Sequence, residues 1–155
     1  MADEANMTVP GIQGSCDIQG REGTIRVQYV EHNVSRPYDI DTGQPTGRRV
    51  HSPFVIRKEV DKASPLLYRD LAEGKKYDSV ELKWYRTAKD GNQEHYFTTK
   101  LTDALLVSIK ALKKDTQDLS SKSYKDMEDV SFVYRRIDWK EETNGVEAYD
   151  DWRKA

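Results

Sequence analysis

The first regular pattern in this chain is an alternation of apolar and polar residues between Thr24 and His32. Every second residue there is apolar, which is the period of a strand with one buried face. The alternation returns between Val50 and Val60, where Pro53 predicts an edge or a bend because proline has no amide hydrogen for a ladder. The residues expected to point inward are Ile25, Val27, Tyr29, Val50, Phe54 and Ile56, with Arg26 and Gln28 on the opposite face.

Further strands are predicted where β-branched and aromatic residues gather between turn residues. Asp90–Gly91 favours a tight hairpin turn, and the long strand after it is expected to bend near Asp103. The predicted strands are Asn6–Ile12, Tyr77–Thr87 with Val80, Leu82 and Trp84 inward, Glu94–Thr102 continuing as Leu105–Leu112, and Val130–Lys140. Between the last two, the polar stretch Lys113–Lys125 is expected to form a mobile loop.

One helix is predicted, between Asp61 and Gly74. Ser64 is expected to cap its first turn, Pro65 suits the first helical position, and Gly74 suits the end. Its two to three turns are too short to be stable alone, so the helix must pack on the strands through Leu67 and Leu71.

A long loop from about Ser35 to Arg49 separates the two alternating strands and is rich in Pro, Gly, Asp and Thr. Loops of this length without structure of their own are uncommon in compact domains, and are usually functional or disordered. We expect this one to pack on another molecule, with a merely mobile surface loop as the alternative.

Composition agrees with one soluble domain spanning residues 1–155. The 155 residues are enough to bury roughly two-thirds of the unfolded surface, and 34% of them are charged. Residues 1–5 read as a flexible leader, and residues 141–155 as a polar tail that Tyr149 and Trp152 anchor or that adds a last short strand. The 25 basic and 27 acidic residues give a net charge of −2, which indicates neither nucleic acid nor a strongly charged partner.

The N-terminus predicts no signal peptide, because it carries acids where a signal peptide needs bases and lacks an apolar segment. No run approaches the ~18 apolar residues of a membrane span. Cys16 is the single cysteine, which excludes an intramolecular disulfide and suits folding in a reducing cytoplasm.

Candidate catalytic chemistry is weak. His32, His51 and His95 are scattered along the sequence and match no metal-binding spacing, and no phosphate-binding or nucleophile motif is present. A Cys16 nucleophile paired with His32 or His51 is far less probable than a small half-buried cysteine. A calcium site at Asp39 and Asp41 is a remote alternative to solvated loop carboxylates. We therefore expect no enzyme activity, no metal and no cofactor.

Several ordered blocks together resemble the haemolysin-coregulated protein (Hcp) family, the tube subunit of bacterial type VI secretion systems. Because many blocks agree in order, the resemblance is more specific than any single motif, and it extends from about Met7 to Trp152. The blocks are Gly14–Ser15, Gly20–Gly23, Glu31–Tyr68, Leu82–Arg86, Glu94–Leu101 and Val130–Trp139.

The resemblance implies a mainly β fold: two packed sheets forming a β-barrel, with one short flanking α-helix and an extended loop. It further implies a homo-hexameric ring that stacks into the inner tube, with a sheath, a spike protein and small effectors as partners. Such a protein is assembled in the bacterial cytoplasm and then secreted to the medium or a target cell. Nucleic acid and membrane insertion are not expected.

The predicted site residues belong to two surfaces. The extended loop is expected to form a subunit interface, and one face of the second strand is a candidate lining of the lumen. The interface residues are Pro37, Asp39, Asp41, Thr42, Gly43, Pro45, Gly47, Arg48 and Arg49, and the lumen candidates are Arg26, Gln28 and Glu31. The main alternative function is a ring-shaped effector-binding chaperone or export receptor without stable tubes, and a small secreted enzyme is the weaker one.

Overall fold

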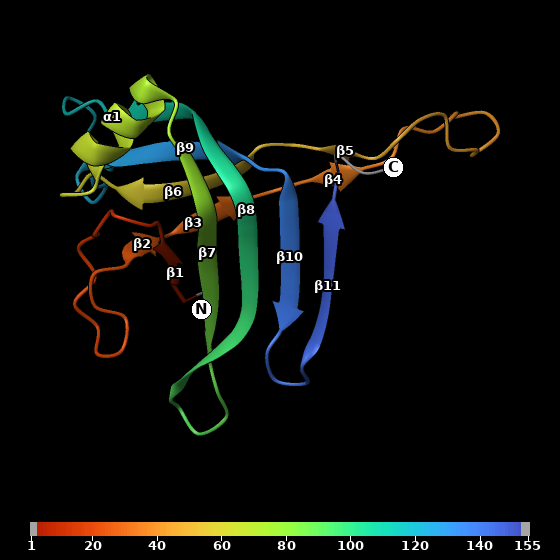
Figure 1. Cartoon of the computed structure of the whole chain (residues 1–155). Coiled ribbons are helices and arrows are strands. Elements are labelled where there is room, and N and C mark those ends of the chain that lie inside the picture. Colours follow the sequence, from red (N-terminus) through yellow and green to blue (C-terminus); the bar gives the residue numbers. More distant parts are fainter. Residues whose placement is uncertain (1–2, 153–155) are drawn as a thin grey trace.

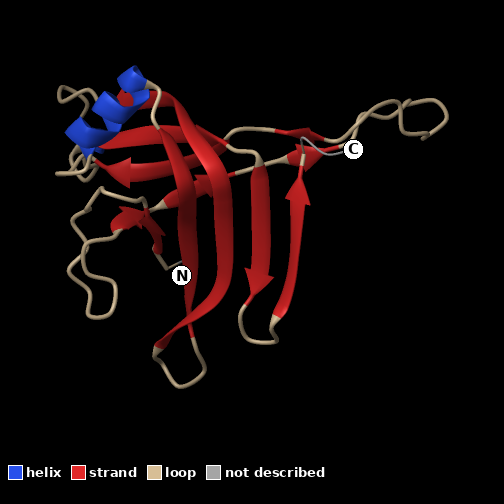
Figure 2. Ribbon diagram, in the orientation of Figure 1, coloured by secondary structure: helices blue, strands red, loops and turns tan. Residues whose placement is uncertain are grey.

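The computed structural model describes residues 3–152 and is mainly β, with one α-helix at one end of a curled sheet (Figures 1 and 2). This confirms the predicted fold class. The elements are β1 (Ala5–Thr8), β2 (Ile25–Val27), β3 (Tyr29–Glu31), β4 (Val34–Ser35), β5 (Val50–His51), β6 (Phe54–Glu59), α1 (Ser64–Glu73), β7 (Lys76–Thr87), β8 (Gln93–Leu112), a 3₁₀ turn (Leu119–Ser121), β9 (Met127–Val133), β10 (Arg136–Glu141) and β11 (Val146–Asp151).

Within residues 3–152, nine strands form one sheet in which β8 has the central place. β7 pairs along one edge of β8, while β9 and β10 divide its other edge between them. β9 then pairs with β6 and β6 with β3, so one half of β8 belongs to each of two layers. The two expected packed sheets are therefore two halves of one curled sheet.

The bend that joins these layers lies where the sequence predicts it. Asp103 has φ of 54°, a left-handed conformation uncommon outside glycine. Residues before it pair with β10, and Leu105–Leu112 pair with β9. The prediction of a single strand from Val130 to Lys140 is wrong for the same reason, because the chain must leave one layer at Tyr134 and Arg135 before pairing again in the other.

The strand predicted at Thr24–His32 is likewise divided, at Gln28. Its first part, β2, pairs with β1, and its second part, β3, pairs with β6. Because β2 and β3 are the two ends of the sheet path and are consecutive in the chain, the chain itself joins the two ends. The backbone N–H of Gln28 supports this junction by donating to the Arg57 carbonyl at 2.9 Å.

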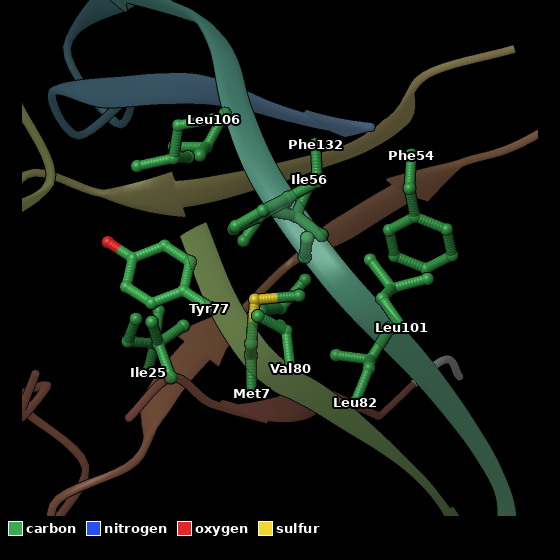
Figure 3. Packing of buried hydrophobic residues seen from close by; sticks show 14 of the residues in the cluster. Met7, Ile25, Phe54, Ile56, Tyr77, Val80, Leu82, Leu101, Leu106 and Phe132 are labelled. Carbon is green, nitrogen blue, oxygen red and sulfur yellow. The ribbon is translucent and has the colours of Figure 1, made fainter. Parts of the chain in front are cut away.

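The space between the layers is filled by apolar side chains from strands of both layers (Figure 3), namely β1, β2, β6, β7, β8, β9 and β10. Of the residues expected to point inward, Ile25, Val27, Phe54 and Ile56 are buried, whereas Val50 is 52% exposed and Tyr29 is 47% exposed. Both exceptions lie in two- or three-residue strands whose neighbours change, so strict alternation does not carry through them.

Helix α1 has the predicted proline and glycine but not the predicted cap. Gly74 ends it with φ of 69°, and its buried face includes Leu67. The residue before its first turn is Ala63, without a side-chain cap, because the Ser64 hydroxyl instead donates to Glu128 at 2.7 Å. In the described part of the chain, no helix is both long and apolar enough to cross a membrane.

A buried ion pair explains what Ser64 does instead. Lys58 and Glu128 each have 1% of the side chain exposed, and Lys58 Nζ lies 2.5 Å from the Glu128 carboxylate. The ammonium also donates to Ser64 Oγ and lies 3.0 Å from Asp61. Since every donor of the ammonium has a buried acceptor, this cluster joins β6, β9 and the start of α1.

The start of the chain is more ordered than predicted where the structure describes it, whereas the tail contains the last short strand that is one of its two predicted forms. Ala5 already belongs to β1, and Glu4 forms an ion pair with Arg26 at 2.7 Å, although both residues fall in the expected leader. Of the expected tail, Val146–Asp151 form the last strand. Residues 1–2 of the leader and 153–155 of the tail lie outside the described residues.

We expect Lys58→Met to lower the free energy of unfolding by about 3–5 kcal/mol, because the Glu128 carboxylate would stay buried without its cation. Urea denaturation followed by circular dichroism measures this change. Lys125→Met is the matched control, since Lys125 pairs with Glu59 while 71% of its side chain is exposed. The control should change stability by less than about 0.5 kcal/mol, and an equally small loss for Lys58→Met would contradict the role given to the buried pair.

Candidate functional site

The extended loop, residues 36–49, has structure of its own. Its base is the two-stranded ribbon of β4 and β5, and Tyr38 and Pro45 form a further bridge. Backbone bonds from Asp39 N to Gln44 O (2.8 Å) and from Thr46 N to Pro37 O (2.9 Å) continue this hairpin toward the tip. Figure 1 shows the loop extending away from the barrel, beyond β4 and β5.

The tip of this loop presents apolar side chains to solvent. Ile40 is 86% exposed and Tyr38 is 65% exposed. Gly43 provides the turn with φ of 72°, and the Asp39 carboxylate accepts a bond from the Asp41 amide. An ordered hairpin that exposes an isoleucine at its end is a typical contact element for another protein surface.

The predicted interface residues of the loop do not all share this exposure. Gly47 packs near the Pro37 ring, and Arg48 is exposed. Arg49 differs, because its guanidinium contacts this same chain: Nε lies 2.5 Å from Asp150 Oδ2, and Nη2 donates to the Asp151 carbonyl at 2.9 Å. Arg49 thus attaches the base of the loop to β11. The exposed members of the predicted set are Pro37, Asp39, Asp41, Thr42, Gly43, Pro45, Gly47 and Arg48.

Beside Arg49, two histidines predicted to be scattered meet at one tyrosine. His51 contacts the Tyr134 hydroxyl through Nδ1 at 2.7 Å and Asp150 through Nε2 at 2.7 Å. His32 contacts the same hydroxyl through Nε2 at 2.6 Å. Sequence separations of 83 and 102 residues hide these contacts from any local pattern. We name Arg49, Asp150, His51, Tyr134 and His32 the loop-base chain.

Burial and nearby charges shift the pKa values of three side chains in the loop-base chain. Burial, together with nearby His51, lowers the pKa of His32 from its ordinary value of 6.5. Burial also raises the pKa of Tyr134, helped by the negative charge of Asp150. The hydrogen bond from Arg49 lowers the pKa of Asp150. The lowered pKa of His32 favours its neutral form, and Arg49 favours the ionised form of Asp150.

The remaining candidate catalytic residues lie elsewhere. Cys16 is buried, and its sulfur accepts a bond from the Asn6 amide at 3.3 Å rather than meeting a histidine. His95 contacts Thr98 at 2.6 Å. Among residues 3–152, no group of three or more histidine, cysteine and acidic side chains is arranged to hold a metal ion. The hydrogen bonds at the base of the loop can hold the loop against the rest of the protein.

The three candidate lumen residues lie in two different places on the structure. Glu31 lies in a row with Val55, Ser131 and Ser108 on the outer face of β3, β6, β9 and β8, because residues opposite one another share a face. Gln28 reaches the edge of this polar outer face, contacting Glu59 at 3.4 Å. Arg26 does not join it, since its guanidinium is bound by Glu4.

The sheet also has an open edge at β11. Within the described residues β11 pairs with β10 as its one neighbouring strand, so its other side is an edge of the sheet. Val146 and Tyr149 on this strand are 65% and 61% exposed. Unprotected edges of this kind template pairing with another chain.

Acid should destabilise the protein through His32. Because the folded state lowers the pKa of this imidazole, the unfolded chain takes up the proton first once the pH falls below about 6.5, and folding stability is lost from there downward. We expect the thermal unfolding midpoint to fall from pH 7.5 to pH 5.5, and to fall less in His32→Gln. A pH slope in His32→Gln equal to that of the wild type would contradict this assignment.

Comparison with known proteins now adds to this geometry. A family model described as "Type VI secretion system effector, Hcp" matches residues 6–140. The "Major exported protein" of Pseudomonas aeruginosa is 47% identical over 135 residues, covering 87% of this chain and 78% of its own.

Solved structures agree over nearly the whole fold. A "Crystal structure of Hcp protein" superposes with a TM-score of 0.87 at 34% identity, covering 99% of this chain and 100% of that one. An Hcp1 protein of E. coli EAEC 042 carrying two substitutions gives 0.83 at 33% identity, covering 98% and 99%. "Secreted protein Hcp3" of Pseudomonas aeruginosa gives 0.75 at 34% identity, covering 97% and 99%. This chain therefore belongs to the Hcp family of secreted type VI secretion system proteins.

Proposed function

We propose that this protein is a non-enzymatic structural subunit whose hexameric rings stack into the inner tube of a type VI secretion system. The observation that carries the proposal is the extended loop, an ordered hairpin that places Ile40, 86% exposed, far from the core of its own chain. An apolar side chain held out on a built hairpin is best explained by a surface on another subunit. The exposed residues of the predicted interface set surround it.

Ring formation is supported by the open edge at β11. Contacts between two different surfaces of identical subunits close into a ring when the rotation allows it. The outer edge of β11, with its exposed Val146 and Tyr149, supplies one such surface. Since β11 and the extended loop are separate surfaces, one can serve the ring while the other serves stacking.

The polar outer face of β3, β6, β9 and β8 is the proposed lining of the lumen. The residues of one row across it are Glu31, Val55, Ser131 and Ser108, and those of the next are Tyr29, Arg57, Asp129 and Lys110. Arg57 and Asp129 neutralise each other at 2.8 Å. A face of mixed polarity without a strong net charge suits the passage of varied small effectors. Gln28 and Glu31 belong to this proposed lining, and Arg26 borders it.

The proposed partners and location follow from this role. A sheath and a spike protein would surround and cap the tube, and the sheath would supply the work of ejection, so the subunit needs no nucleotide, metal or cofactor. Assembly in the bacterial cytoplasm would be followed by export of the protein. The second candidate is a ring-shaped effector chaperone, which the same polar face would serve, and which predicts rings that do not stack at high concentration.

Removing the loop tests the stacking role. Deleting residues 39–47 should leave the barrel folded by circular dichroism, because the core contains none of these residues. Ring stacking, seen by negative-stain microscopy at high protein concentration, should be lost.

A matched pair of point variants sharpens this test. Ile40→Lys should reduce stacking, while Leu119→Lys, which changes a 75% exposed leucine in a different loop, should leave it unchanged. Long tubes from the deletion or from Ile40→Lys would count against the assignment of the loop to stacking.

A further inference from the structure

The loop-base chain links the extended loop to the barrel through hydrogen bonds that depend on proton position. We propose that neutral His32 and His51 hold the loop in the orientation that stacks rings, and that adding protons to this pair releases it, so that mild acid separates stacked rings. This inference rests on the stacking role proposed above.

The loop-base chain lies where the extended loop meets the rest of the protein. His32 lies just before β4 and His51 lies in β5, so the two ends of the loop each contribute an imidazole. Tyr134 comes from the junction of β9 and β10, and Asp150 comes from β11. The bonds between Asn33 and Ser52, in contrast, stay within the ribbon itself. The orientation of the ribbon against the barrel therefore depends on the loop-base chain.

The hydrogen-bond partners fix where each proton lies. An ionised Asp150 accepts only, so His51 Nε2 carries a hydrogen and donates to it. Nδ1 of a neutral His51 then accepts, and the Tyr134 hydroxyl donates to it. The Tyr134 oxygen in turn accepts from Nε2–H of His32. When both imidazoles are neutral, each hydrogen in this series of hydrogen bonds therefore has one position.

A proton added to His51 breaks this order. Nδ1 becomes a donor, so the hydroxyl hydrogen of Tyr134, a residue only 4% exposed, loses this acceptor and finds another at His32 Nε2 only after the His32 hydrogen has moved to Nδ1. A buried donor without a partner is unfavourable. A proton added to His32 places a positive charge with its ring centre 6.3 Å from that of His51, which opposes a charge on the second ring.

The carboxylate that contacts the histidine pair is shared with an arginine. Asp150 lies 2.7 Å from His51 Nε2 and 2.5 Å from Arg49 Nε. Arg135, the residue after Tyr134, contacts Asp103 and Asp151, with Lys76 at 3.9 Å from Asp103. The uncharged rings of Phe54, on His32, and Trp152, stacked on His51, also pack on the two imidazoles. The Asp150 carboxylate therefore already has a cationic partner when both histidines are neutral.

Imidazole nitrogen NMR tests the proton order directly and does not depend on stacking. At pH 7.5 we expect His51 to carry its hydrogen on Nε2 alone, and His32 to titrate below the ordinary imidazole value of 6.5. A His51 hydrogen on Nδ1, or a His32 that titrates at or above this value, would overturn the proposal.

Negative-stain counts of stacked rings at pH 7.5 and pH 5.5 test the consequence. For the wild-type protein, the number of stacked rings should fall at least about fivefold from pH 7.5 to pH 5.5, while single rings persist. His32→Gln should keep more of its stacks at pH 5.5 than the wild type does, because the glutamine amide can donate where Nε2–H does and takes up no proton, which leaves His51 as the imidazole that acid can charge. His95→Gln, with a histidine removed away from the loop-base chain, should behave as wild type.

A separate variant interrupts the hydrogen bonds of the loop-base chain without adding a charge. Tyr134→Phe removes the hydroxyl shared by the two histidines, and should reduce stacking at pH 7.5 while circular dichroism shows a folded barrel. Stacks that survive acid in the wild type, or Tyr134→Phe stacks as numerous as those of the wild type, would overturn the inference. Absence of wild-type stacks at pH 7.5 would instead contradict the proposed function, and the NMR result would still decide the proton order.

Discussion

The structure depends on one strand that serves two layers. β8 runs for 20 residues, and its bend at Asp103 lets its first half pair with β10 and its second half with β9. At that bend Arg135 contacts both Asp103 and Asp151, which fixes the point where β9 ends and β10 begins. Because Tyr134 precedes Arg135, the same junction places the hydroxyl that receives the two histidines of the loop.

The surfaces proposed for assembly follow from this junction. β10 and β11 extend from the first half of β8, and the free side of β11 is the open edge of the sheet. β9, β6 and β3 extend from the second half and form the polar outer face. The extended loop leaves between β4 and β5 and is joined to β11 through Arg49 and Asp150. Loop and edge are therefore mechanically connected, although they are far apart in sequence.

Local patterns in the sequence predict much of this fold. The Asp-Gly hairpin, the bend near Asp103, the helix ended by Gly74 and the buried faces of the long strands all depend on residues close together in the chain. The errors arise where distant partners decide. The cap expected of Ser64 fails because buried Glu128 takes its hydroxyl, and the strand expected from Val130 to Lys140 divides because its two halves pair with different parts of β8.

The candidate site shows the same division. The length and turn residues of the extended loop single it out from sequence, but the loop-base chain joins residues up to 102 positions apart and leaves no periodic signal. The pair His32 and His51 is visible in the sequence only as two polar residues at the two ends of a loop. Tyr134 and Asp150 carry no mark at all that separates them from other strand residues.

The most direct test of the central claim is the mass of the wild-type protein in solution, measured by light scattering across a range of concentrations at pH 7.5. The account predicts a mass six times that of the 17.9 kDa chain, and larger multiples of that ring as concentration rises. A protein that remains a monomer at every concentration would contradict a self-assembling tube subunit.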